Sequence, residues 1–506
     1  MMPYALVALA PLLHLLAALL VVLLHLAGRA RGEAGEPLTA RLTLGACVLA
    51  CGVLLILDGL ALVQGAPGQV RVAEWFASGT LRVSLSFTLD GLSLGLGTLV
   101  AAIGLVTLRF SAQYMHREAG FHRFFIGMNL FVAGMLGIIL AGNAVLAFVG
   151  WELVGLSSWM LIGYAFEQET ATVNAQRAFL TNRVGDAGFL LGIALAQLWL
   201  GSLEWADIAV GAGHLPTLYI SLLSLGFVSA ALAKSAQVPF SPWIARALEG
   251  PTPSSAIFYG AVMVHVGVYL LIRLEPVLSA APGVMSLLAM IGLGTALYGG
   301  IVGYAQTDVK SALLFATLTQ VGLMFLACGL GLFQLAAWHM ALHMVWRTWQ
   351  FLAAPSYMHL LDAATPPAPA WLRRSPRLYT AALQRFWLEP LADHLLTRPT
   401  QALARDVRAV DDNVVHHIMG MSEARRAAAL LGEEAVVKGR GLAGAALMWL
   451  ARHLDHFEQH LVLRGIGGRL GAGLRRLGGW LTWAEGLFEQ PRYLLLIVMA
   501  TLVVIL

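Results

Sequence analysis

Cysteine is scarce in this 506-residue sequence, which contains only Cys47, Cys51 and Cys328, all of them inside apolar runs. Three cysteines cannot supply a disulfide framework or the ligands of an iron–sulfur cluster. No Gly-rich phosphate loop opens after a strand, and no nucleophile motif is present. We therefore expect no cofactor, no metal site and no catalytic site within this chain.

Charged residues are also scarce, at 12% of the chain, whereas soluble domains carry about 25%. Hydrophobic residues make up 58% and recur in runs of about 20 residues, which is the helical length that crosses a hydrocarbon core of roughly 30 Å. These features predict an all-α, polytopic transmembrane helix bundle of about 12 spans. The net charge of +4 is concentrated late in the chain, where basic residues would contact membrane lipid rather than nucleic acid.

Hydropathy places the longer spans at residues 4–26, 43–64, 91–109, 124–141, 144–165, 178–200, 217–238, 254–273, 284–305, 311–331 and 333–354. The first run has no basic segment before it and no small-residue cleavage site after it, so we interpret it as a span rather than a secretory signal. The final run, residues 493–506, is short for a full span and fits a tilted or half-buried membrane anchor.

Basic residues are unevenly distributed between alternate loops. If the N-terminus faces outside, the outer loops hold Arg71, Arg82 and Arg273, and the inner loops hold Arg29, Arg31, Arg41, Arg109, Arg117, Arg123, Arg177 and Lys310. Inner loops of membrane proteins carry an excess of Lys and Arg, so this asymmetry favours that orientation. We predict a multi-pass protein of the bacterial cell inner membrane.

Composition divides the chain into four parts. Residues 1–110 are predicted to form N-terminal transmembrane helices with an outer hairpin, and residues 111–355 the core of the bundle. Residues 356–490 are predicted to form a cytoplasmic or interfacial helical tail, and residues 491–506 the C-terminal anchor. The hairpin prediction rests on alternating apolar and polar residues in QVRVAEWFASGTLRVSLSF, with a simple linker as the alternative.

The tail begins with the Pro-rich segment ATPPAPAWLRRSP and is rich in arginine. A stripe at three-and-four spacing predicts an amphipathic helix, formed by Leu447, Leu450, Leu454, Phe457 and Leu461. Such a helix lies in the membrane interface or packs on a soluble partner.

Ionisable residues inside the predicted spans need an explanation, because each costs about 3 kcal/mol at the centre of a spanning helix. Glu152 has no lysine or arginine within a helical turn, so its partner must come from another helix. Arg183 and Asp186, at the start of the predicted sixth span, are three residues apart and share a helix face. They form either a local ion pair at the interface or part of a conducting path.

Lys234 lies late in the seventh span and is followed by Pro239 and Pro242. Proline lacks an amide proton, so the helix is predicted to break there and to leave backbone carbonyls beside a buried lysine, as at the ion sites of transporters. An acid near a buried lysine retunes its proton affinity, and Glu152 and Lys234 are our candidate switching pair.

Histidines in two further spans are candidates for a proton relay, because imidazole titrates near neutral pH. His265 lies alone in the eighth span, where a structural role is the alternative. His339, His343 and Arg347 repeat every four residues and so share one helix face. The same spacing suits a metal, but a third ligand is not evident. Lys310 is predicted to be an interfacial anchor rather than a conducting residue.

Four runs resemble the NuoL-type proton-translocating subunits of respiratory complex I and the related Mrp antiporters: GWELVGLSSWMLIGY, AFLTNRVGDAGFLLGI, AKSAQVPFSPWIARALEGPTPSSA and YAQTDVKSALLFATLTQVG. The resemblance covers residues 70–355 and implies an antiporter-like, proton-conducting core over residues 111–355. It also implies roles in proton translocation for Glu152 of the GWE motif, Lys234 of KSAQ and Asp186 of NRVGD.

The sequence departs from that family at several points. Arg347 and Tyr259 stand where the family has lysine and histidine, and a Pro-rich tail replaces the family's second broken helix with its own buried lysine. A shortened chain with a long helical tail resembles the DabB family, the membrane subunits of two-component inorganic-carbon systems. That resemblance implies a cytoplasmic, zinc-containing, carbonic-anhydrase-like partner (DabA-like).

We therefore expect a proton- or cation-conducting subunit that drives an inorganic-carbon accumulation complex. The alternative is a proton-pumping NuoL-type subunit of NADH-quinone oxidoreductase or a subunit of an Mrp-type Na⁺/H⁺ antiporter, with complex I or Mrp subunits as partners. A structural scaffold with vestigial charges is the third class.

Overall fold

The computed structural model describes residues 2–79, 81–360 and 368–410. It divides into two compact units, of which the first contains the described residues up to Leu396 and the second begins at Thr397. The second unit contributes the helix α19 (Arg398–Val410) to the described residues. All further description concerns the first unit.

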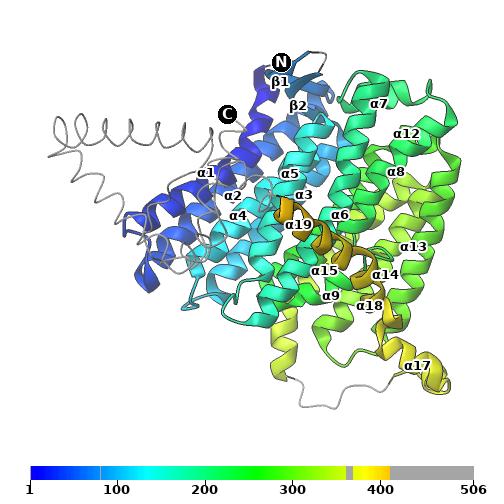
Figure 1. Ribbon diagram of the computed structural model, residues 1–506. Helices are drawn as coiled ribbons and strands as arrows, with labels where there is room; N and C mark the ends of the chain where they lie inside the picture. The colour runs from blue at the N-terminus through cyan, green and yellow to red at the C-terminus, as the bar shows by residue number, and fades with distance from the viewer. Residues whose placement is uncertain (1, 80, 361–367, 411–506) are drawn as a thin grey trace, which may run out of the picture. The chain divides into compact units, whose positions relative to one another are not determined.

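Long helices dominate the first unit (Figure 1): α1 (Leu9–Leu26), α2 (Gly32–Gln64), α3 (Gly91–Tyr114), α4 (Phe121–Leu140), α5 (Ala144–Ile162), α6 (Glu169–Leu200), α8 (Thr217–Lys234), α13 (Pro282–Gly303), α14 (Val309–Gly329) and α15 (Phe333–Leu360). Shorter helices connect them: η1 (Met2–Ala8), α7 (Trp205–Ala212), α9 (Pro242–Arg246), η2 (Ala247–Glu249), α10 (Thr252–Ser255), η3 (Ala256–Ala261), η4 (Met263–His265), α11 (Val266–Arg273), α12 (Glu275–Ser279), α16 (Ala370–Arg373), α17 (Pro376–Leu383), η5 (Arg385–Trp387), α18 (Leu388–Ala392) and η6 (Asp393–Thr397).

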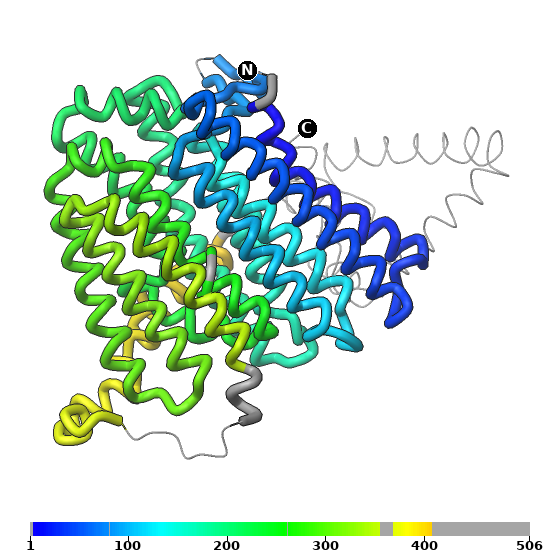
Figure 2. Tube along the Cα trace, turned by 180° about the vertical axis from the view of Figure 1, so that it is seen from behind, coloured from blue at the N-terminus to red at the C-terminus, as the bar shows by residue number. Residues whose placement is uncertain are grey.

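The long helices lie side by side, with α1 and α2 at one side of the unit and α13 and α14 at the other (Figure 2). Within the described residues, ten helical segments are long and apolar enough to cross a membrane. The predicted all-α membrane bundle is therefore confirmed, with ten such segments where about 12 spans were expected. Helix α15 is also long, but His339, His343 and Arg347 lower its hydropathy. The predicted anchor at residues 493–506 and the amphipathic stripe at residues 447–461 lie outside the described residues.

The predicted hairpin is confirmed. Strand β1 (Gly68–Ser78) pairs antiparallel with β2 (Leu81–Leu89), and Ser78 is opposite Leu81 across the turn. The hairpin lies at the same end of the unit as α7 and α12 (Figure 1). We refer to this end as the hairpin side.

Buried polar contacts hold the hairpin against the loops between helices. The carboxylate of Glu204, at the start of α7, accepts hydrogen bonds from Gln69 of β1 and from Ser84 and Ser86 of β2, the last at 2.6 Å. The Asn143 side-chain amide donates to the Ser84 carbonyl oxygen at 2.7 Å and caps α5 through its oxygen. The hairpin is therefore fixed to the helix ends at this side.

Small residues let neighbouring helices approach closely. A Cβ atom at Gly188 of α6 would clash with Ser229 Oγ of α8, and one at Gly150 of α5 would lie 2.7 Å from the Gly134 carbonyl oxygen of α4. Small residues at helix interfaces are typical of membrane bundles, where association depends on close packing. Helices α5, α6 and α8, which carry the ionisable residues, are thus held at short distances.

Replacing Glu204 with alanine is expected to lower stability, because it leaves several buried donors without an acceptor. The expected loss is about 2 kcal/mol, which thermal unfolding of the detergent-purified protein measures as a lower midpoint. Asp207→Ala is the control, because Asp207 is close in sequence but is exposed and bonds only to Ser202 among the hydrogen bonds of the described residues. Equal midpoints for the two variants would contradict the prediction.

Candidate functional site

Helices α5, α6 and α8 bring four charged side chains together inside the bundle. The Arg183 guanidinium forms ion pairs with the Glu152 carboxylate and, at 2.7 Å, with Asp186 Oδ2. Lys234 Nζ lies 3.9 Å from Asp186 Oδ1, and these two side chains are 0% and 5% exposed. The result is a line of alternating charges from Glu152 through Arg183 and Asp186 to Lys234, which we call the ion network.

The ion network bears on two predictions. The partner of Glu152 does come from another helix and is Arg183 of α6, while Glu152 and Lys234, the candidate switching pair, are joined through Arg183 and Asp186. Arg183 and Asp186 do not lie at the start of the span, because α6 begins at Glu169 and not near residue 178. The predicted local ion pair at three-residue spacing is formed, and it lies in the middle of α6.

Trp151 and Gly155 of α5 shape the ion network. The Trp151 indole Nε1 donates to Asp186 Oδ1 at 2.6 Å, and its carbonyl oxygen accepts from Lys234 Nζ at 3.4 Å. A Cβ atom on Gly155 would lie 3.0 Å from Arg183 Nη2 and 3.3 Å from Lys234 Nζ. Glycine at this position therefore lets both cations approach α5. Sequence reasoning missed both residues, although the GWE motif contains the tryptophan.

The predicted helix break is confirmed. Helix α8 ends at Lys234, and Pro239 and Pro242 follow before the short helix α9. The carbonyl oxygens of the last turn are bonded locally, since the Ala233 oxygen accepts from Trp243 Nε1 at 2.9 Å. Lys234 thus lies at a helix C-terminus, where the partial negative charge of the helix stabilises a cation.

A second interruption was not predicted. Residues Thr252–Arg273 form an α-helical turn (α10), a π-helical segment (η3), a short 3₁₀ turn (η4) and then α11. The backbone leaves the helical region at Val262, where φ is −136° and ψ is −54°. No proline marks this interruption, so the sequence carries no clear signal of it. It lies three residues before His265.

The histidines predicted for a relay come together at this second interruption. His265 Nε2 lies 2.9 Å from His343 Nδ1, and Arg347 Nε donates to His343 Nε2 at 3.4 Å. His339 is displaced toward α14, with Nε2 2.8 Å from Gln320 Oε1. His265, predicted as a lone residue, is thus paired with the α15 histidine face. We call His265, His343, His339 and Arg347 the histidine cluster.

Buried polar side chains lie in and beside the two interrupted helices. Ser235 follows Lys234 directly and lies against Gly267 of α11, two residues from His265. Among the described residues, several buried polar atoms here have no hydrogen-bond partner in the protein: Ser235 Oγ, Gln237 Oε1, Ser241 Oγ, Ser255 Oγ and Tyr259 OH. Buried polar groups are normally bonded to protein or water. These atoms follow the break after Lys234 or lie in and beside η3, so both interruptions are polar in the interior of the bundle.

The tail contributes charges that sequence reasoning missed. Glu389 of α18 pairs with Arg177 of α6 at 3.7 Å and with Arg246 of α9, and Asp393 lies 3.4 Å from Arg177. These contacts join the tail to the short helix that follows the break. Lys310 lies in the first turn of α14, which agrees with its predicted place at the end of a span.

Two family profiles match the chain. Residues 141–364 match the transmembrane family described as NADH:quinone oxidoreductase/Mrp antiporter. Residues 75–125 match the N-terminus of chain 5 of NADH-ubiquinone oxidoreductase (complex I). The first match includes the whole ion network and the whole histidine cluster.

Curated relatives agree with these matches. The chain is 38% identical over 305 residues to the chloroplastic NAD(P)H-quinone oxidoreductase subunit 5 of Nephroselmis olivacea, which covers 59% of this chain and 47% of that protein. It is 33% identical over 333 residues to NAD(P)H-quinone oxidoreductase chain 5 of Synechocystis sp., covering 64% and 49%. The chain spans about half the length of these relatives.

Solved structures show the same fold. A chain of the Mrp complex from Dietzia sp. superposes with a TM-score of 0.59 at 28% identity, covering 68% of this chain and 37% of that chain. A chain of the archaeal membrane-bound sulfane sulfur reductase has a TM-score of 0.60 at 19% identity, covering 72% and 58%, and shows the fold alone. The predicted multi-pass membrane location is consistent with these matches, and the chain is similar to the proton-antiporter family of complex I subunit 5 and Mrp-type subunits over residues 75–125 and 141–364.

Proposed function

We propose that this chain is the proton-translocating membrane subunit of a complex I-type or Mrp-type assembly. The observation that carries the proposal is the ion network, in which four charged side chains are joined inside the bundle where α8 ends. Buried ionisable residues at a broken helix are typical of ion sites in transporters. Helix packing alone does not require a charged side chain in the interior, yet Lys234 is fully buried there with its Nζ 3.9 Å from the Asp186 carboxylate.

Asp186 is the shared element of the proposed mechanism. Its carboxylate faces Arg183 on one oxygen and Lys234 on the other. When Glu152 is protonated, Arg183 loses that partner and interacts more strongly with Asp186, so Asp186 stabilises the Lys234 ammonium less. Lys234 then releases its proton, which arginine cannot do near neutral pH.

The route beyond Lys234 fits protons better than sodium ions. Sodium needs a shell of oxygen ligands, whereas the histidine cluster presents ring nitrogens and a guanidinium. Imidazoles pass protons because one ring nitrogen donates while the other accepts. Arg347 keeps its charge, so we assign it the role of a fixed cation beside the relay rather than a carrier.

Two candidate functions remain, and each implies a different partner subunit. The relatives are named as subunits of NAD(P)H-quinone oxidoreductases and of an Mrp complex, which favours a place in such an assembly. The second candidate is an inorganic-carbon complex with a DabA-like zinc subunit, favoured by the Pro-rich segment that follows α15 where a further broken helix was expected. Copurification of flavin and iron–sulfur subunits supports the first, and copurification of a zinc-containing soluble subunit with bicarbonate uptake supports the second.

Lys234→Ala is expected to abolish proton flux, because the ion network then lacks the group that releases the proton. Flux is measured as the decay of a pH gradient in inverted membrane vesicles that contain the full chain. Lys310→Ala is the matched control, since Lys310 lies in the first turn of α14 and is predicted to be an anchor. The Lys310 variant should retain flux within about twofold, as for surface substitutions.

Unchanged flux in Lys234→Ala would refute the translocation proposal. Flux that also survives the combined Glu152→Gln and Lys234→Ala change would indicate a scaffold whose charges are vestigial. Variant amounts in the membrane are compared by immunoblot, so that loss of protein is separated from loss of transport.

Gly155→Ala is expected to reduce flux about tenfold, because the added methyl group forces Arg183 or Lys234 away from α5 and lengthens the contacts of the ion network. Gly137→Ala is the control, since a Cβ there makes only an ordinary contact of 3.7 Å with Gly150. The pH-gradient assay checks both variants, and equal flux in the two would show that Gly155 does not set the network's geometry.

A further inference from the structure

Helix α11 carries a polar stripe that leads away from the histidine cluster. His265, Tyr269 and Arg273 recur every four residues and therefore share one face of the helix. The stripe covers about 12 Å at 1.5 Å per residue and ends on the hairpin side. His265 belongs to the proposed proton route, whereas Tyr269 and Arg273 lie beyond it.

Hydrogen bonds connect Tyr269 and Arg273 to α3 and α4. The Tyr269 hydroxyl donates to the Ile139 carbonyl oxygen at 2.6 Å and lies 3.3 Å from Ser93 Oγ. Arg273 Nη2 donates to the same Ser93 oxygen at 2.6 Å. Arg273 also forms a two-pronged ion pair with Asp90, at 2.5 and 3.1 Å. A continuous chain of polar contacts, which we call the polar column, thus runs through Tyr269, Ser93, Arg273 and Asp90.

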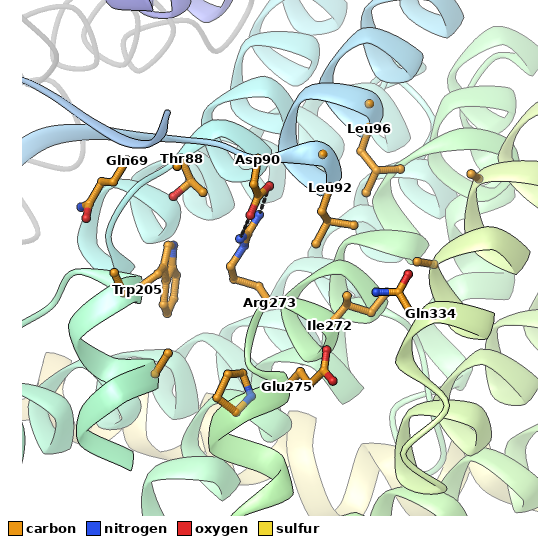
Figure 3. Close-up of a pocket in the computed structure, with 18 of the residues that line it drawn as sticks. Gln69, Thr88, Asp90, Leu92, Leu96, Trp205, Ile272, Arg273, Glu275 and Gln334 are labelled. Carbon is orange, nitrogen blue, oxygen red and sulfur yellow. Dashed lines mark hydrogen bonds and ion pairs between the residues drawn. The ribbon is translucent and has the colours of Figure 1, made fainter. Parts of the chain in front are cut away.

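A cleft of about 830 Å³ opens beyond the ion pair. Figure 3 shows the Asp90–Arg273 pair between the hairpin residues Gln69 and Thr88 and the α3 residues Leu92 and Leu96. The cleft lies on the hairpin side and is lined by the ends of α3, α7, α11 and α15. The polar column therefore ends in a space of ample size for water.

A small apolar void separates the histidine cluster from this column. It has a volume of about 10 Å³, and its lining includes His265, Tyr269, Met135, Met340 and Met344. This is room for about one water molecule. Of the two His265 ring nitrogens, Nδ1 has no hydrogen-bond partner among the described residues, whereas Nε2 contacts His343.

We propose that this column is the release half of the proton route, in which His265 passes a proton through the methionine-lined void to Tyr269 and Ser93, and the Asp90–Arg273 pair gates release into the cleft. The inference rests on the proposed function and extends it. The column supplies an exit that does not need the further broken helix, with its own buried lysine, that the related family has after this part of the chain. Apolar constrictions close a path by excluding water, so the methionine-lined void is the point at which this exit closes.

The ion pair completes the closed state. Burial by itself would raise the pKa of the Asp90 carboxyl, but the hydrogen bonds and charge of Arg273 outweigh burial and hold that pKa below its usual value. Asp90 is therefore ionised at neutral pH and keeps Arg273 in place. Asp90 also caps α3 by accepting from the Ser93 amide at 2.8 Å, which is a structural role that a test must leave intact.

Val100→Thr tests the void. Val100 lines it and is 1% exposed, and threonine keeps the shape of valine while adding a hydroxyl that attracts water. We expect proton leak in inverted vesicles to rise about threefold or more as the constriction becomes wet. Val106→Thr is the matched control on the same helix, because Val106 is 58% exposed and lies outside the column. Its leak should equal that of the native chain.

The leak must also depend on the ion network. Combining Val100→Thr with Lys234→Ala should lower the leak to the level of Lys234→Ala alone, because the column receives protons only from the ion network. A leak that persists in the double variant would show a separate path and overturn the inference.

Asp90→Asn is the second, independent measurement. Asparagine caps a helix as well as aspartate, so the fold is kept, while the ion pair is lost. We expect a leak of the same size as in Val100→Thr. If neither variant differs from Val106→Thr while Lys234→Ala still abolishes flux, the exit proposal is wrong and the proposed function stands. If Lys234→Ala leaves flux unchanged, the proposed function itself fails.

Discussion

The structure depends on one constraint, which is that an ionised side chain inside the bilayer must have a partner of opposite charge. The four residues of the ion network satisfy this constraint together, because each carboxylate faces at least one cation and each cation at least one carboxylate. The close packing of α5, α6 and α8 through small residues follows from the same need, since charges interact strongly only at short distance. The helix end at Lys234 adds its partial negative charge to the site.

Interrupted helices place polar groups where regular helices would not. The break after Lys234 and the π-helical segment before His265 lie in neighbouring segments, and Ser235 contacts α11 near both. Irregular backbone inside a membrane is tolerated only where protein or a water-filled cavity surrounds it. Buried polar atoms without a partner among the described residues, such as Ser235 Oγ and Tyr259 OH, lie at these two interruptions.

The sequence predicted local features well and contacts between distant residues poorly. The spans, the hairpin around Ser78 and the break after Lys234 follow from hydropathy, alternation and proline, which act on neighbours in the chain. Arg183 was not identified as the partner of Glu152 because the two lie on different helices, 31 residues apart. Asp90 and Arg273 are 183 residues apart, and the π-helical segment has no proline to reveal it.

Electroneutrality limits how many protons such a network can hold. Two carboxylates and two cations sum to zero, so the resting network carries no net charge into the bilayer. A proton that arrives at Glu152 leaves one uncompensated positive charge, which costs several kcal/mol in a medium of low effective dielectric constant. Arg183 cannot give up its proton, whereas Lys234 can. In the proposed mechanism, release of a proton from Lys234 toward Ser235 and His265 restores neutrality, as does its return from Glu152, so the charge balance limits the network to one extra proton at a time.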